Sequence, residues 1–454
     1  MNGSAQSLRL YSSAAVAADI PPKQLFLFVF GSISFNLFLC LIHTHAFGVS
    51  NFHVMAIEAI IISGVFLTSY RFIDQGFLII FSCAILWALT LASIRVVIGT
   101  EDSIDIKIVR DLTIPFAFFL LGTRITALQM ADRVVVASAM IVFVIGLFEY
   151  FSLETFTRIF DVAGYYIARG TMDAADALQS DNLFISGMRP EAASAGGGRN
   201  LLPFLGGHRV SSIFLEPVSM GNFGVIVFMW GLVRSKFDRM WHVAPMLLGL
   251  ALIIMADSRF GAYLCVIAVA IIFVPTVIAN MVAFSIPLLA MALLSIVPMM
   301  VTGSYDPQNR YADNTSTGRL VLSAQMLGSF DFLTWMGLRP PYMEAFDSGY
   351  AYIIAGIGFI GFLAAWILLF SLRGPSLQFY AFRNLTALYY GLILCISNSP
   401  FTIKTAALLW MLIGALSVGI RSRIVGSATS EILETKHSPG HQADSKLGSG
   451  NERR

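Results

Sequence analysis

Apolar residues are gathered in long runs along this chain, and polar residues fall mainly between the runs. A helix that crosses the hydrocarbon core of a bilayer needs about 20 mainly apolar residues. Twelve runs approach this length, so the pattern predicts an all-α integral membrane protein with about 12 transmembrane helices. The fourth run includes Arg124, and the eleventh is short. The predicted spans are residues 24–42, 52–70, 77–98, 112–129, 134–152, 212–233, 241–257, 260–279, 282–301, 350–372, 384–399 and 404–420.

Two of the polar intervals are long, at residues 153–211 and 302–349, whereas the others are short. Loops of this length in a compact protein are usually functional or disordered. The first loop contains three consecutive glycines within residues 195–198, which favours local flexibility. The second is rich in polar and aromatic residues and adjoins two apolar runs, so we expect it to be ordered.

Lys and Arg residues are concentrated on one side of the predicted helices. Because cytoplasmic loops are enriched in these residues, both termini are predicted to be cytoplasmic. Both long loops then lie on the outer face of the membrane. The basic residues assigned to the cytoplasmic side are Arg71, Arg124, Arg133, Arg234, Lys236, Arg239, Arg373, Arg383, Arg421 and Arg423.

Composition also indicates a lipid environment. Of the 454 residues, 57% are hydrophobic and only 12% are charged, whereas soluble domains carry about 25% charged residues. The first apolar run is interpreted as a retained helix, because no clear signal-peptide cleavage site follows it. Residues 1–423 form the predicted polytopic membrane domain. Residues 424–454 are polar and are predicted to be a disordered cytoplasmic tail.

Ionisable residues gather near the outer ends of the predicted helices. Each costs about 2.5–3.5 kcal/mol inside a bilayer, so each requires a reason. Snorkelling or an isolated ion pair would explain any one of them, but their common side favours an outward-facing polar cavity. Arginines in such a cavity would suit an anionic ligand, because a guanidinium binds phosphate bidentately. The residues concerned are Glu58, Glu149, Glu216, Arg259 and Lys404 in or beside the helices, and Arg209, Arg310, Arg319, Arg339 and Asp347 in the loops.

Other chemistries have little support in the sequence. His43 and His45, with His53 nearby, could hold zinc, but no Cys or carboxylate pattern accompanies them. They are interpreted as interfacial polar residues, and no metal or other cofactor is expected. The four cysteines lie within apolar runs and are interpreted as core residues. A net charge of +2 without a dense basic stripe argues against a nucleic-acid partner.

Four segments together resemble the Wzy-type polysaccharide polymerases and the related O-antigen ligases. They are the run from Arg209 to Glu216-Pro217, the turn Asp257-Ser258-Arg259-Phe-Gly261, the Thr317-Gly318-Arg319 triplet, and Asp347-Ser348-Gly349-Tyr350 followed by Gly358 and Gly361. Each motif is short, but their order and their placement on the outer face are more specific. The resemblance covers residues 205–365 by motif and the rest by topology. Ligases typically have a histidine where Asp347 stands, which favours a polymerase.

The resemblance implies a GT-C-like, metal-independent glycosyltransferase in the bacterial inner membrane. Its substrate would be an oligosaccharide linked to undecaprenyl pyrophosphate, and a chain-length regulator and a flippase would be possible partners. Arg259, Arg319 and Arg209 would bind the pyrophosphate. Asp347 is the first candidate for the general base and Glu216 the second, although an acid at a helix N-terminus is also favoured by the helix dipole alone.

Two alternatives remain open at this point. One is an O-antigen ligase-type transfer of the glycan. The other is a lipid-linked oligosaccharide flippase or transporter without catalysis. Transporters tend to place charged sites near the bilayer midplane, on broken helices within repeated halves. The unequal halves and large outer loops of this chain favour the enzyme.

Overall fold

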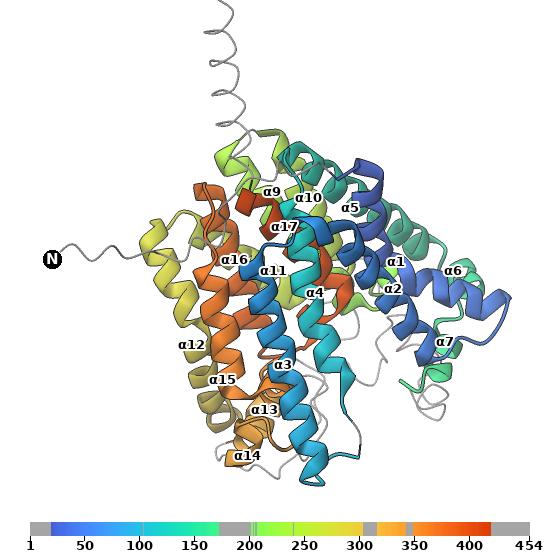
Figure 1. Cartoon of the computed structure of the whole chain (residues 1–454). Coiled ribbons are helices and arrows are strands. Elements are labelled where there is room, and N and C mark those ends of the chain that lie inside the picture. The colour runs from blue at the N-terminus through green and yellow to red at the C-terminus, as the bar shows by residue number, and fades with distance from the viewer. Residues whose placement is uncertain are drawn as a thin grey trace, which may run out of the picture.

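The computed structural model describes residues 20–102, 104–171, 201–202, 204, 207–238, 240–302, 316–341 and 348–418. Within these ranges the chain forms helices and turns, with no strand (Figure 1). The expected tail at 424–454, the glycine run at 195–198 and Asp347 lie outside the described residues.

Among the described residues, seven helices are long and apolar enough to cross a membrane. The expectation of an α-helical, multi-pass membrane protein is therefore confirmed. These helices are α1 (Pro22–His45), α2 (Asn51–Ser69, extended by a 3₁₀ turn to Phe72), α3 (Gln75–Val97), α5 (Leu128–Phe151), α9 (Pro217–Phe237), α12 (Thr276–Thr302) and α15 (Gly349–Ser371).

Five further helices occupy the remaining apolar runs. Two of them begin clearly earlier than predicted. The fourth begins at Ile106 instead of residue 112 and ends before Arg124, whose Nη1 donates to the carbonyl of Thr68 at 2.7 Å. The eleventh begins at Leu377 instead of residue 384, after the cap at Ser376. The five are α4 (Ile106–Thr123), α10 (Val243–Met255), α11 (Arg259–Ile272), α16 (Leu377–Ile393) and α17 (Ile403–Val418).

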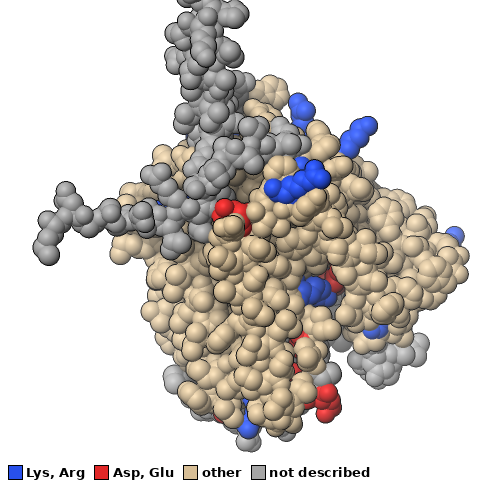
Figure 2. Space-filling view, in the orientation of Figure 1, with Lys and Arg blue, Asp and Glu red and all other residues tan. Residues whose placement is uncertain are grey.

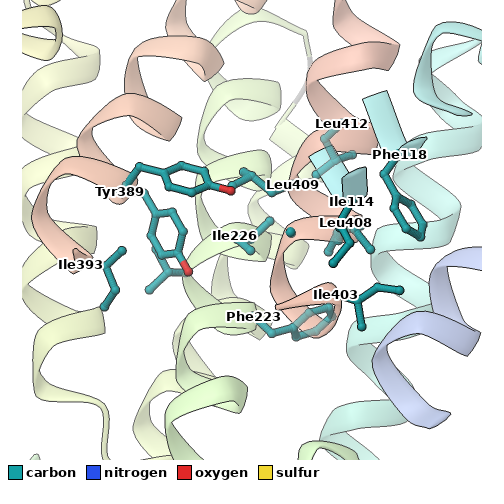
Figure 3. Packing of buried hydrophobic residues seen from close by; sticks show 14 of the residues in the cluster. Ile114, Phe118, Phe223, Ile226, Tyr389, Ile393, Ile403, Leu408, Leu409 and Leu412 are labelled. Atoms are coloured by element: carbon teal, nitrogen blue, oxygen red, sulfur yellow. The ribbon is translucent and has the colours of Figure 1, made fainter. Parts of the chain in front are cut away.

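The core is built around α9, α4 and α17. Of the apolar stretch of α9, 89% is buried, so this helix faces protein on nearly all sides. Figure 3 shows Ile114 and Phe118 of α4 facing Leu408 and Leu412 of α17, with side chains from α9 and α16 packed beside them. By contrast, only 17% of the apolar stretch of α3 is buried. Helix α3 therefore lies at the periphery, and Figure 2 shows a flank that is largely free of charged atoms.

Helices α4 and α17 approach each other closely because both carry glycine at the contact. A Cβ atom on Gly122 would lie 2.1 Å from the carbonyl oxygen of Met411. A Cβ on Gly414 would lie 2.2 Å from that of Phe119. Small residues of this kind let membrane helices pack backbone against backbone.

In the described part of the chain, four short helices lie at one end of the bundle, at the bottom and lower right of Figure 1. We call this end the loop end. They belong to the two segments that the sequence identifies as long loops. These helices are α6 (Leu153–Ile159), α7 (Val162–Ala168), α13 (Ser316–Gly328) and α14 (Phe332–Trp335). The loop end is also where α9, α11, α15 and α17 begin.

Helix α15 is broken near its middle. Gly358 has φ 72° and ψ 162°, a conformation that is essentially restricted to glycine. The break leaves carbonyl groups without helical partners, and two side chains of α3 satisfy them. Arg95 Nη2 donates to the carbonyl of Gly356 at 2.7 Å, and Trp87 Nε1 donates to that of Ile357 at 2.8 Å.

Candidate functional site

The segment that leads into α9 is fixed by one buried carboxylate. Glu149, at the end of α5, is 1% exposed and accepts hydrogen bonds from the backbone N–H groups of Ser211 and Ser212. Its Oε1 also lies 3.0 Å from His208 Nε2. Ser212 and Leu215 have φ of 51° and 59°, which turns the chain sharply before α9. Glu149 therefore has a positioning role: it fixes the path of the chain up to the first residue of α9.

Glu216, which immediately precedes α9, carries the best-defined carboxylate at the loop end. Oε1 accepts a hydrogen bond from Tyr166 Oη at 2.9 Å and one from Lys404 Nζ at 3.3 Å. Oε2 accepts from Ser219 Oγ at 2.8 Å. The side chain still exposes 44% of its surface. Three donors thus orient the carboxylate while one side of it stays open.

The charge state of Glu216 follows from these contacts. Burial alone would raise its pKa, but the ammonium group of Lys404 and the hydrogen bonds from Ser219 and Tyr166 outweigh burial, so the pKa is lowered. The carboxylate is therefore ionised at neutral pH. It makes no side-chain cap to the backbone of α9, so helix capping does not account for its contacts.

Lys404 lies in the first turn of α17 and is 7% exposed. A cation is disfavoured at a helix N-terminus by the helix dipole. Its position is instead explained by its partners, since Nζ donates to the carbonyl of Phe214 at 3.2 Å as well as to Glu216. The positive charge of Lys404 also attracts the carboxylate of Glu58 in α2.

A second ionic cluster joins α2, α4 and α15. Arg110 pairs with Glu58 and with Asp111, each at 2.7 Å. Tyr352 Oη donates to Asp111 Oδ2 at 2.6 Å. The Arg110 side chain is 24% exposed. With Lys404 acting on both Glu58 and Glu216, the two clusters are electrostatically connected.

Helix α7 brings aromatic and basic side chains to the same region. Tyr165 Oη donates to Asn36 Oδ1 at 2.7 Å. Asn36 lies nine residues before the end of α1 at His45. At 1.5 Å per residue, the Tyr165 hydroxyl therefore meets α1 about 14 Å along the helix axis from that end. Arg169 stacks on the rings of Tyr165 and Tyr166.

Arg259 is the first residue of α11, directly after the tight turn that follows α10, as expected from the sequence. It is partly exposed, and its guanidinium group has no hydrogen bond or ion pair among the described residues. The preceding Ser258 packs against Gly221 of α9, where an added Cβ would lie 2.5 Å from Ser258 Cβ. Arg259 therefore lies beside the first turns of the helix that Glu216 precedes.

The other two predicted arginines, Arg209 and Arg319, lie on different elements. Arg209 Nε donates to the carbonyl of Ala256 at 3.2 Å, which places it at the α10–α11 turn with Arg259. Arg319 lies in the first turn of α13, a helix that packs against α12 and α15. The structure thus gathers Glu216, Arg209 and Arg259 around the start of α9.

The sequence did not identify Lys404, Tyr166 or the Arg110 cluster as site residues. Lys404 was noted as a charge near the loop end, but its partner Glu216 is 188 residues away. Ionisable residues placed at the same end of several apolar helices were the available signal. Pairing them requires the tertiary structure.

The histidines near the end of α1 contact loop backbone. His43 Nδ1 accepts from Val49 N at 3.1 Å, and His45 Nε2 lies 3.0 Å from the carbonyl of Ile159. Within the described part of the chain, no group of three His, Cys, Asp or Glu residues is arranged to hold a metal.

Comparison with protein families, curated proteins and solved structures finds no match to this chain. The resemblance to polysaccharide polymerases therefore rests on the short motifs and the predicted topology.

Proposed function

We propose that this protein is a polysaccharide polymerase of the bacterial inner membrane. It transfers a growing glycan from undecaprenyl pyrophosphate to a hydroxyl group of a lipid-linked repeat unit. The observation that carries the proposal is Glu216: an ionised, oriented and partly exposed carboxylate directly before α9, the helix against which the turn with Arg209 and Arg259 packs. In this proposal the chain has twelve spans, cytoplasmic termini and a loop end that faces outward.

The reaction requires a proton acceptor and a means of stabilising the leaving group. The acceptor hydroxyl loses its proton to a carboxylate while its oxygen forms a bond to the anomeric carbon of the donor sugar. The bond from that carbon to the pyrophosphate oxygen breaks, and the pyrophosphate leaves with the electron pair. Arginines stabilise this charge, which is commonly the largest catalytic contribution, and a positioned base contributes about 10²–10⁴-fold.

The test of function uses the purified protein in liposomes with a lipid-linked repeat unit as sole substrate. The expected product is a ladder of longer glycans on the lipid, formed without added metal or nucleotide sugar. In cells that lack the protein, single repeat units without long chains are expected. A folded protein that elongates nothing in liposomes contradicts the proposal.

Two carboxylates compete for the role of base. Asp347, the first candidate, lies outside the described residues, and Glu216 is supported by its geometry. Asp347→Asn and Glu216→Gln keep side-chain shape but remove the carboxylate. Elongation in membranes, at matched protein levels, distinguishes them: the variant that inserts normally but fails to elongate identifies the base. Normal elongation by both would leave charge stabilisation and substrate positioning as the mechanism.

A transporter is the second candidate, because α15 is broken within the bundle. Broken helices and intramembrane charges such as the Glu58–Arg110 pair are common in transporters. A flippase would move a fluorescent lipid-linked oligosaccharide across liposome bilayers without lengthening it. The same liposomes therefore decide between the two functions.

A further inference from the structure

Arg169, at the C-terminal end of α7, differs from the other partly buried arginines near it. Its guanidinium group stacks on Tyr165 and Tyr166, with Cζ 5.2 Å and 5.7 Å from the ring centroids. Nη1 lies 3.5 Å from Asn36 Oδ1, a long contact, and Nε is buried without a hydrogen-bond partner. Among the described residues, no carboxylate lies within ion-pair distance of Arg169.

Three other arginines of the bundle are paired with carboxylates, whereas Arg383 is held by carbonyl and amide oxygens. Arg95, Arg110 and Arg234 each have a carboxylate oxygen within 3.1 Å, 2.7 Å and 2.9 Å. Removing a cation from water is costly unless an anion and hydrogen bonds replace the water. The two tyrosine rings supply part of this compensation through cation–π contacts, but Nε stays without a hydrogen-bond partner.

The positive charge of Arg169, like that of Arg259, has no carboxylate partner among the described residues. Tyr166, on which it stacks, donates to Glu216, so Arg169 lies next to the oriented carboxylate. The acidic groups nearby, Glu216 and Glu58, already pair with Lys404 and Arg110. Stacking fixes the plane of the guanidinium, and a fixed plane suits bidentate binding of phosphate through the N–H edge.

We infer that Arg169 is an anion-binding residue that holds a phosphate group of a polyprenyl-pyrophosphate-linked glycan beside Glu216. This assignment rests on the proposed function. It places a third cation, contributed by the first long loop, near the start of α9. The tyrosine pair acts as a support that sets the orientation of the guanidinium.

The test measures binding of farnesyl pyrophosphate, a short polyprenyl pyrophosphate, to the full-length protein in nanodiscs by calorimetry. Arg169→Ala is expected to weaken binding about tenfold or more, because charge-assisted hydrogen bonds are lost. Arg169→Lys keeps the charge but loses the planar guanidinium, so its affinity for the probe should lie between those of the wild type and Arg169→Ala. Arg158→Ala, an exposed arginine on neighbouring α6, is the matched control and should bind as the wild type.

Wild-type affinity in Arg169→Ala overturns the assignment. If Arg169→Ala does not fold, as judged by thermal unfolding, Arg169→Lys decides alone, and wild-type affinity in that variant overturns it. Absence of binding by the wild-type protein overturns it as well. A wild type that binds the probe with the expected dependence on Arg169, yet elongates no glycan, contradicts the polymerase proposal and leaves the anion site standing.

Discussion

At the residue scale, the Glu216 carboxylate accepts hydrogen bonds from three donors and stays exposed on one side. Tyr166 and Lys404 orient one oxygen and Ser219 the other. A carboxylate held in this way stays ionised and is oriented before any substrate arrives. The same contacts make its basicity depend on a residue of the last helix, Lys404.

Replacing Lys404 should therefore change the pH dependence of elongation. Lys404 favours the charged form of Glu216 and helps to lower its pKa. In Lys404→Met this attraction is lost and the pKa rises, so the carboxylate becomes protonated at a higher pH on acidification. If Glu216 is the base, the acid limb of the rate profile moves to higher pH. The control is Lys23→Met, exposed at the start of α1; an unchanged acid limb in Lys404→Met would show that Lys404 does not tune the base.

Arg259 offers a test of phosphate recognition. Lys keeps the charge but loses bidentate geometry. Arg259→Lys should slow elongation at least about tenfold, since loss of one charge-stabilising donor can cost about 10²–10³-fold. Arg373→Lys is the control, because Arg373 is exposed at the opposite end. Equal loss in both variants at normal protein levels would argue for a folding effect.

Arg234 would be a poor control for that experiment, although the sequence places it at the cytoplasmic end. It is 3% exposed and pairs with Asp132 at 2.9 Å and with Asp238 at 2.7 Å. Asp132 also accepts a hydrogen bond from Trp230. Removing Arg234 would leave a partly buried carboxylate without its main partner, which destabilises the fold itself.

At the scale of elements, the break in α15 connects this helix with α3 and α14. Side chains of α3 satisfy the carbonyl groups that the break exposes. The turn after α14 packs into the same place: a Cβ on Gly358 would lie 2.6 Å from the carbonyl oxygen of Met336. The break is therefore an integral part of the packing.

Gly358→Ala should destabilise the protein by about 1–3 kcal/mol, the usual cost of a residue forced into a sparsely populated backbone conformation. Thermal unfolding in detergent measures the effect. Gly31→Ala is the matched control, since a Cβ at this helical position meets no atom within 4 Å. Gly31→Ala should be neutral or slightly stabilising; equal midpoints for the two variants would contradict the importance of the break.

Much of the helical layout could be predicted from the sequence, because apolar runs of membrane length are a strong signal. The clearest differences in helix position come from caps and charges: Asp105 caps α4 and starts it early, and Arg124 ends up in the turn that follows it. Helices α6 and α7 were not predicted, since each has only seven residues. The break at Gly358 follows from tertiary contacts that no local pattern contains.

The candidate site was only partly predictable. Carboxylates and arginines near one end of the helices were visible in the sequence, and Arg209 and Arg259 lie at one turn, which packs against the helix that follows Glu216. The donors that define Glu216 come from α7 and α17, far away in the sequence. Their pairing depends on how α7 packs beside α1, which a single sequence does not encode in any local pattern.

At the scale of the whole molecule, the orientation in the membrane decides which substrates reach the site. Reporter fusions at residues 170 and 330 should report the outer side, and fusions at residues 236 and 435 the cytoplasm. The physical reason is the bias of Lys and Arg toward cytoplasmic loops. A cytoplasmic signal at residue 330 would overturn the proposed face, and with it the access of outward-facing lipid-linked substrates.

The glycine contact between α4 and α17 has a consequence at a distance. Gly414 lies ten residues after Lys404 on the same helix, which at 1.5 Å per residue is about 15 Å along its axis. Even a methyl group at Gly122 would force the two helices apart. Because α17 is one continuous helix, that displacement would be carried along it to the Lys404–Glu216 pair. In related chains, substitutions at these two glycines should therefore be rare, or accompanied by compensating changes around Lys404, although Gly414 lies about 15 Å along the helix from that lysine.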